Sequence, residues 1–152
     1  MANRQWQPGA IIRKQLADGM HYYARLLEFP WAAFYRHRSG PPESDLAAIA
    51  AHDVLFTIAA HKSLLAKNQW EPIGHLPLDR SLLPPAAQAV WDDADNCQII
   101  DAHGEMRHAT PKECAGLEPA AVWEPEHIDD RLQDAFGGRP NRWLEQMIPK
   151  RF

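Results

Sequence analysis

An Asp-Gly pair at positions 18 and 19 separates two strand-like segments near the beginning of the chain. A two-residue turn of type I′ needs positive φ at both central residues, and Asp-Gly is among the pairs that adopt this geometry most readily. Residues 20–27 alternate between two faces, as the side chains of a β-strand do. The pair and its flanks therefore predict a β-hairpin over residues 8–29.

Further strands are expected after the hairpin. Residues 31–37 (WAAFYRH) and 54–60 (VLFTIAA) are short, apolar and partly β-branched, as buried strands are. Residues 70–79 contain Pro72 and Pro77, which remove backbone donors and limit this segment to an edge strand or an extended stretch.

Three other segments are less uniform. Residues 97–110 (CQIIDAHGEMRHAT) predict a second hairpin, whereas residues 82–96 are interpreted as a connector broken by prolines. Residues 44–53 fit either a short helix capped by Ser44 or Asp45, or an extension of the strand that follows. We favour a strand core at Val54 to Ala60 and leave both interpretations of residues 44–53 open.

The pattern becomes helical in the last third. Thr110 and Glu113 form a capping-box sequence with Pro111 at the first helical position. Residues 125–136 predict a longer amphipathic helix, and a short amphipathic tail begins at Pro140. Because strands come first and helices last, the sequence predicts an α+β fold. We expect one domain over residues 1–152, with a twisted antiparallel β-sheet from the N-terminal two-thirds packed with two to three C-terminal helices.

Charge is unevenly distributed, although the net charge is only −4. Residues 1–40 contain six Lys or Arg side chains, while residues 113–134 contain seven carboxylates against Arg131 alone. In the expected helix over residues 125–136 the buried stripe consists of Ile128, Leu132, Ala135 and Phe136. The acidic residues Glu126, Asp130 and Asp134 recur every four positions on the opposite face, with Asp129 at its border.

This acidic face has two interpretations. It is either a solvated surface or a surface for a basic partner. Like charges at four-residue spacing destabilise a helix by a few tenths of a kcal/mol each, and a helix built only for solubility usually mixes both signs. The scarcity of cations therefore favours a basic partner.

The sequence offers little for catalysis or metal binding. Cys97, His103, His108 and Cys114 form a C-x5-H-x4-H-x5-C pattern, which is too irregular for an ordinary zinc site. A Gly-x-Ser-x-Gly elbow and a Gly-rich phosphate loop are both missing from the sequence. We expect no catalytic residue, no cofactor and no metal.

The two cysteines are too few for a disulfide scaffold, so they are interpreted as reduced thiols. The first residues lack the apolar run of a signal peptide, and the longest apolar stretch is too short to cross a bilayer. We therefore expect a cytoplasmic protein that does not bind membranes. The sequence does not indicate an oligomeric state.

Several segments in this order resemble the immunity-protein 26 family of bacterial polymorphic toxin systems. They are GAIIRKQLADGMHYYARLLEF followed by AAFY, Leu55-Phe56, WEPIGHLPL, ATPKECAGLEPAAVWEPEHIDDRL, and the GRPN-x-W ending at Gly138 to Trp143. The chain departs from the family at Ala24, where members tend to have glycine before the strand arginine.

The resemblance implies an immunity protein that binds and neutralises a toxin without catalysis. Its partner would be a cognate toxin C-terminal domain, and the acidic face suggests that this domain has a basic surface. The contact residues that we predict are Glu126, Asp129, Asp130 and Asp134, with Trp123 as an anchor and Glu124 at the rim.

Two other functions remain open at this point. A small hydrolase would use buried acids and a histidine such as His127, and it would need a strongly shifted pKa in a pocket. A nucleic-acid-binding module would use the N-terminal basic residues and neighbouring tyrosines, although the net negative charge makes nucleic acid an unexpected partner. Those basic residues are Arg13, Lys14, Arg25, Arg36 and Arg38.

Overall fold

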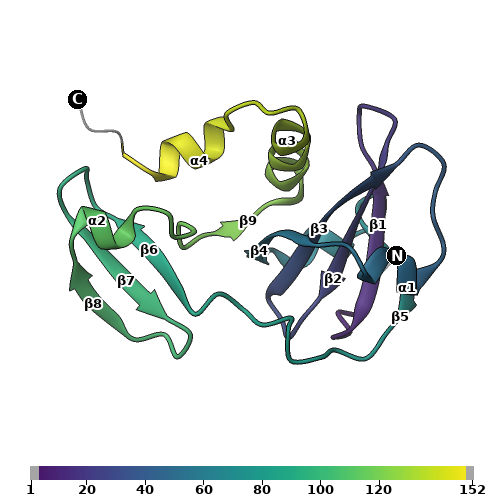
Figure 1. Ribbon diagram of the computed structural model, residues 1–152, viewed down its shortest axis with the longest axis horizontal. Helices are drawn as coiled ribbons and strands as arrows, with labels where there is room; N and C mark the ends of the chain where they lie inside the picture. The colour runs from purple at the N-terminus through teal and green to yellow at the C-terminus, as the bar shows by residue number, and fades with distance from the viewer. Residues whose placement is uncertain (1–3, 150–152) are drawn as a thin grey trace. The chain divides into compact units, whose positions relative to one another are not determined.

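Two β-sheets and four short helices make up the computed structural model, which describes residues 4–149 (Figure 1). The α+β class predicted from the sequence is confirmed. The strands form two sheets rather than one. The chain forms two compact units, the first extending to Pro84 and including Val122–Glu126, the second formed by Pro85–Ala121 and the chain after Glu126. The expectation of a single domain stays a prediction.

The first unit contains a six-stranded sheet in the order β5-β1-β2-β3-β4-β9. All neighbouring strands are antiparallel except β4 and β9, which are parallel. The bounds of these strands are β1 Ala10–Gln15, β2 His21–Leu26, β3 Trp31–Ser39, β4 Val54–Ala60, β5 Glu71–His75 and β9 Val122–Trp123.

The predicted hairpin is confirmed as β1 and β2, in which Gln15 pairs with His21. Gly19 has φ of +81°, the left-handed conformation that favours glycine. The predicted two-residue type I′ turn is wrong, because Asp18 does not have positive φ and the backbone N–H of Leu16 donates to the carbonyl of Met20 across a three-residue loop. The Asp18 side chain accepts a hydrogen bond of 2.9 Å from the backbone N–H of Met20, which fixes the turn further. The strands at 31–37 and 54–60 and the edge strand after Trp70 are confirmed as well.

The ambiguous segment after residue 44 contains helix α1 (Leu46–Ala50), which ends before β4 begins. Asp45 caps this helix by accepting a hydrogen bond of 3.2 Å from the backbone N–H of Ala48. Of the two interpretations of this segment, the short helix capped by Asp45 is therefore the correct one, and the strand begins only at Val54. Ile49 is fully buried and packs with Ile11, Tyr23 and Tyr35.

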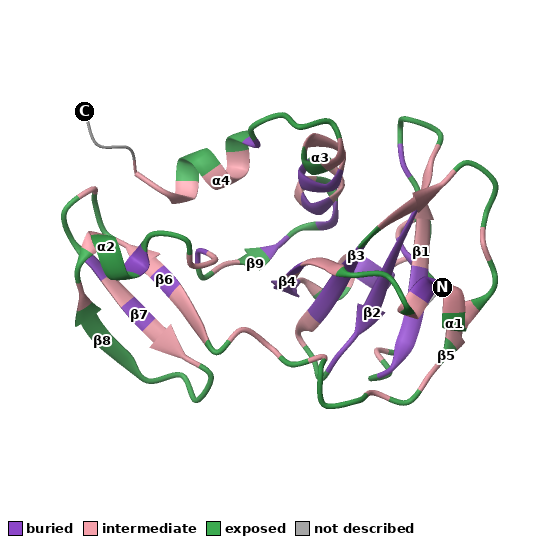
Figure 2. Cartoon of the chain, in the orientation of Figure 1, coloured by how far each residue is buried: buried purple, intermediate pink, exposed green. Residues whose placement is uncertain are grey.

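The opposite face of the six-stranded sheet holds the largest buried side chains. Trp70 is fully buried and packs edge-on against Phe34, with ring centroids 5.3 Å apart. Leu64 and Leu65 are buried in the 3-10 helix η1 (Lys62–Leu65), which precedes Trp70. Figure 2 shows that the buried residues of the first unit are concentrated in β1 to β4.

The second unit contains an antiparallel sheet in the order β6-β7-β8. Its strands are β6 Ala87–Trp91, β7 Cys97–Asp101 and β8 Met106–Ala109, and its helices are α2 Pro111–Cys114, most of α3 Pro125–Phe136, and α4 Arg142–Met147.

The hairpin predicted over residues 97–110 and the capping box at Thr110 are confirmed. The connector predicted over residues 82–96 is wrong, because its middle third forms β6. The prolines at 84 and 85 lie just before this strand, where a missing backbone donor does no harm. Within residues 4–149, no helix is long and apolar enough to span a membrane.

Candidate functional site

The acidic segment begins where the chain returns to the six-stranded sheet. Trp123 pairs with Ala60 at the end of β4, and its carbonyl oxygen accepts a hydrogen bond of 2.9 Å from the backbone N–H of His61. Its side chain is only 1% exposed. The structure therefore places Trp123 in the core, whereas an interface anchor would have to be exposed. Pro125 follows as the first residue of α3, where its missing N–H has no intrahelical partner to lose.

The predicted acidic residues differ in their surroundings. Glu124, Glu126 and Asp130 are exposed, whereas Asp129 and Asp134 are half-buried. Glu126 lies in the first turn of α3, where the positive end of the helix dipole stabilises a carboxylate. The five carboxylates are therefore not one uniform solvent-facing row.

The apolar face of α3 is confirmed at two positions and wrong at a third. Ile128 and Leu132 are fully buried, but Ala135 is exposed. Arg131, at 8% exposed, takes the additional buried position, because both terminal nitrogens of its guanidinium donate to the carboxylate of Glu118. This bidentate geometry provides strong hydrogen-bond acceptors for both guanidinium nitrogens of a buried arginine.

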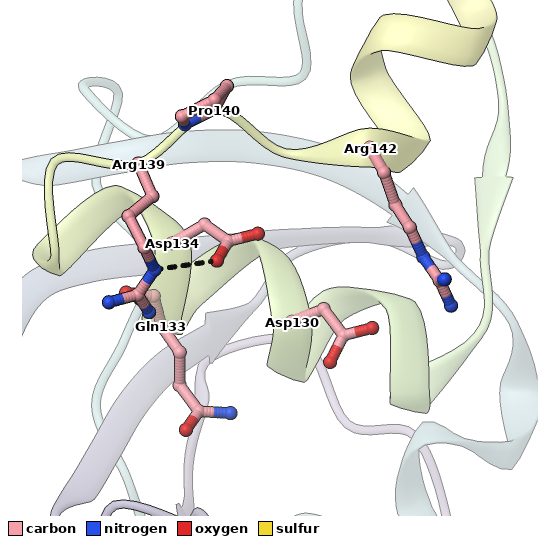
Figure 3. Close-up of a pocket in the computed structure, with 6 residues that line it drawn as sticks. All are labelled: Asp130, Gln133, Asp134, Arg139, Pro140 and Arg142. Atoms are coloured by element: carbon pink, nitrogen blue, oxygen red, sulfur yellow. Dashed lines mark hydrogen bonds and ion pairs between the residues drawn. The ribbon is translucent and has the colours of Figure 1, made fainter.

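Asp134 is engaged by the loop that leads to α4. It accepts hydrogen bonds of 3.2 Å from Nε of Arg139 and 3.0 Å from the amide nitrogen of Asn141 (Figure 3). Asn141 is 6% exposed and also caps α4, because its side-chain oxygen accepts a hydrogen bond of 3.0 Å from the backbone N–H of Leu144. Asp134 therefore fixes the start of α4.

Asp130 is engaged by α4 itself. Its carboxylate accepts a hydrogen bond of 3.0 Å from Nε1 of Trp143. The Trp143 ring stacks on His127 with centroids 3.6 Å apart, and the guanidinium of Arg142 lies 4.2 Å from its centroid. The interpretation of the helix as an unpaired acidic face is therefore wrong for Asp130 and Asp134.

These contacts surround an open recess of about 390 Å³. Figure 3 shows its lining, with the Arg139 guanidinium directed at the Asp134 carboxylate. Two acidic and two basic side chains line it, so it is suited to a charged side chain of a partner rather than to an apolar ligand. The lining residues are Asp130, Gln133, Asp134, Arg139, Pro140 and Arg142.

The basic N-terminal residues do not form one open surface. Arg25 is 4% exposed and lies inside the first unit. Arg13 forms an ion pair of 3.2 Å with Glu71, and Arg38 forms one of 3.1 Å with Asp18. Because three of the five predicted cations are buried or paired with carboxylates, the structure offers little support for a phosphate-binding hairpin.

The carboxyl groups with shifted pKa values do not resemble a general acid. The side-chain amide of Asn96 lowers the pKa of Asp93, and the backbone N–H of Thr110 lowers the pKa of Glu113. A general acid in a hydrolase needs the opposite shift, which burial without a donor would produce. Among residues 4–149, no group of three or more His, Cys, Asp or Glu side chains is placed to hold a metal ion.

The two cysteines lie together in the core of the second unit. Cys97 on β7 and Cys114 at the end of α2 are 3% and 1% exposed and belong to one apolar cluster. Burial, together with a hydrogen bond to Cys97, raises the pKa of the Cys114 thiol to about 11. Cysteines react as thiolates, so both burial and this pKa make Cys114 unreactive at neutral pH.

We expect iodoacetamide to alkylate Cys114 in the native protein at least about 100-fold more slowly than a free cysteine at pH 8. The rate should rise as the pH approaches 11, because the thiolate fraction increases. Mass spectrometry of digested samples would measure the rate, with the same reaction in urea as the control. Rapid alkylation of the native protein would contradict the buried position of this thiol.

The chain belongs to the immunity protein 26 family, whose sequence pattern matches residues 7–98. No curated protein and no solved structure matches the chain. The family match ends before the acidic helix, so it includes none of the predicted contact residues.

Proposed function

We propose that this protein binds a cognate bacterial toxin domain and neutralises it without catalysis. The observation that carries the proposal is membership of the immunity protein 26 family over residues 7–98. The toxin domain would be encoded beside this chain and would be met in the cytoplasm of the producing cell. An immunity protein of this kind acts by occupying the toxin, so its own surface needs complementarity rather than reactive groups.

The acidic residues support the proposal that the toxin has a basic surface. Glu124, Glu126 and Asp130 are exposed, and Asp129 and Asp134 are half-buried beside them. Toxins that act on nucleic acid carry cations that hold phosphates, and a carboxylate-rich inhibitor is attracted to the same groups. Long-range attraction of this kind raises the rate of association more than it slows dissociation.

The experiment that tests the proposal uses the purified C-terminal domain of the toxin encoded beside this chain, in a catalytically inactive form. Isothermal titration calorimetry should give a one-to-one complex, and co-expression of this chain should restore growth of cells that produce the active toxin. A toxin domain that neither binds this chain nor loses toxicity in its presence would disprove the proposal.

Charge reversal at Asp130 and Asp134 together is expected to lower the association rate about tenfold at low salt, with a smaller effect at high salt. Because both carboxylates also bind the α4 segment, some loss of order near Trp143 should accompany the change. Stopped-flow measurements at two salt concentrations would give the rates. Glu105→Lys, an exposed charge reversal on the β7–β8 turn, is the matched control. Equal rates for all three proteins would place the interface elsewhere.

A further inference from the structure

One end of the six-stranded sheet brings together three segments that are distant in sequence. In the strand register Trp31 at the start of β3 pairs with Ala59 of β4, and Ala59 pairs with Val122 of β9. One residue further, the backbone N–H of Ala60 donates a hydrogen bond of 2.8 Å to the carbonyl of Pro30. The β2–β3 turn and the entry to α3 therefore flank the same end of β4.

Apolar side chains are exposed at this end. Phe29 is 57% exposed and Val122 is 60% exposed, although both belong to residue types that are normally buried. Trp6 is half-buried and packs edge-on against Phe29 with ring centroids 5.1 Å apart, and its Nε1 donates a hydrogen bond of 2.9 Å to the carbonyl of Leu27. These contacts fix the positions of the two aromatic rings.

Register places Trp31 and Val122 within reach of one partner surface. Residues that are directly paired across strands point to the same face, so the half-buried Trp31 and the exposed Val122 share a face with Ala59 between them. Two strand spacings separate them by about 10 Å. We name Trp6, Phe29, Trp31 and Val122 the aromatic end of the sheet.

Three carboxylates border the aromatic end. Glu28 precedes Phe29, and Glu124 and Glu126 follow Val122 along the chain. All three are exposed, and within residues 4–149 their side chains form no hydrogen bond or ion pair. They differ in this respect from Asp130 and Asp134, which already bind the α4 segment. Unlike Asp130 and Asp134, the carboxylates beside the aromatic end are therefore open to a partner.

We propose that the aromatic end is the surface on which the toxin domain docks, with an apolar side chain of the toxin against Phe29 and Val122 and basic residues opposite the three glutamates. This inference rests on the proposed function and adds a location to it. An apolar centre with a charged rim is the usual anatomy of a protein interface, and aromatic side chains contribute most of the affinity there.

Charge favours the toxin over a second copy of this chain. A two-fold interface places the same patch on both sides, so Glu28, Glu124 and Glu126 would face the same three carboxylates of the copy. Like charges brought together at an interface weaken it substantially. A basic toxin surface has no such conflict.

The test compares four variants for binding to the inactive toxin domain. Phe29→Ala removes the exposed ring, Val122→Arg places a bulky cation against the apolar side chain of the toxin, and the double variant Glu124→Lys with Glu126→Lys reverses the charge of the rim. Leu83→Arg is the matched control, because Leu83 is 66% exposed but lies on the connector that follows β5. Circular dichroism and thermal unfolding would establish that each variant is folded.

We expect Phe29→Ala and Val122→Arg each to raise Kd about tenfold or more, while Leu83→Arg changes it less than about twofold. The double glutamate reversal should mainly slow association, and more so at low salt. If the native chain binds the toxin but all three site variants bind equally well, the inference is wrong and the proposed function stands. If the native chain does not bind the toxin, the proposed function itself fails. Self-association of the native chain that Val122→Arg abolishes would assign this surface to a second copy and overturn the inference.

Discussion

Replacing Trp70 with alanine is expected to lower the free energy of unfolding by about 3–5 kcal/mol, the range for removal of a large aromatic side chain from a core. Trp70 is fully buried, packs edge-on against Phe34, and lies directly before β5. The backbone carbonyl oxygen of Trp70 accepts a hydrogen bond of 2.9 Å from Arg4. Its backbone N–H donates one of 3.0 Å to the carbonyl of Leu64. The substitution would leave a cavity where three segments meet.

Urea unfolding followed by circular dichroism would measure the effect. Because small domains are stable by only about 5–15 kcal/mol, this one substitution would remove a large share of the total. Trp143→Ala is the control, since Trp143 is half-buried on α4 and its removal opens no core cavity. Equal losses for the two tryptophans would mean that Trp70 is not a central core residue.

The second large effect is expected at Arg25. Its guanidinium donates to the carbonyl oxygens of Gly9 at 2.8 Å, Leu76 at 2.6 Å and Pro77 at 2.8 Å, and to the hydroxyl of Tyr35 at 3.3 Å. This one side chain therefore joins the start of β1 to the segment that follows β5. Methionine has a similar length but no donor, so Arg25→Met would leave the carbonyls of Leu76 and Pro77 without a partner.

A hydrogen bond to a charged group contributes about 1.5–3 kcal/mol, and water can replace the lost donor at the exposed Pro77, so Arg25→Met should lower the free energy of unfolding by about 2–4 kcal/mol. Arg25→Lys keeps the charge but lacks the planar arrangement of donors that a guanidinium has. We therefore expect Arg25→Lys to retain only part of the stability that Arg25→Met loses. Arg36→Met, an exposed change on neighbouring β3, is the control and should alter stability by less than about 0.5 kcal/mol. A loss at Arg25 no greater than at Arg36 would show that the guanidinium contacts add nothing.

Local signals in the sequence predicted much of the fold. The hairpin at Asp18-Gly19 and the capping box at Thr110 each depend on residues within a few positions of one another, and both are confirmed, although the hairpin loop has three residues rather than two. Helix α1 was harder, because an alanine-rich segment satisfies helix and strand patterns equally until the Asp45 cap is seen. Strand β6 was missed because prolines before a strand look the same as prolines within a connector.

The candidate site depended on contacts that no local pattern reveals. Helical periodicity places Asp130 and Asp134 together, but only the path of the chain after Gly138 brings Asn141 and Trp143 to them. Arg25 was assigned to a basic surface because the carbonyls that bury it come from residues about fifty positions away. Arg131 rather than Ala135 is buried on α3, because Arg131 pairs with Glu118. This pairing could not be predicted from the helical pattern either.

The end of the family match inside β7 has a practical consequence for shortened versions of this protein. A fragment trimmed to residues 7–98 would keep only the first two residues of β7 and would lose β8, so β6 would have almost no partner. It would also lack β9, which leaves the backbone groups of β4 along one side of the sheet without a neighbouring strand. Unpaired strand edges of this kind recruit other chains, so such a fragment is expected to precipitate during expression.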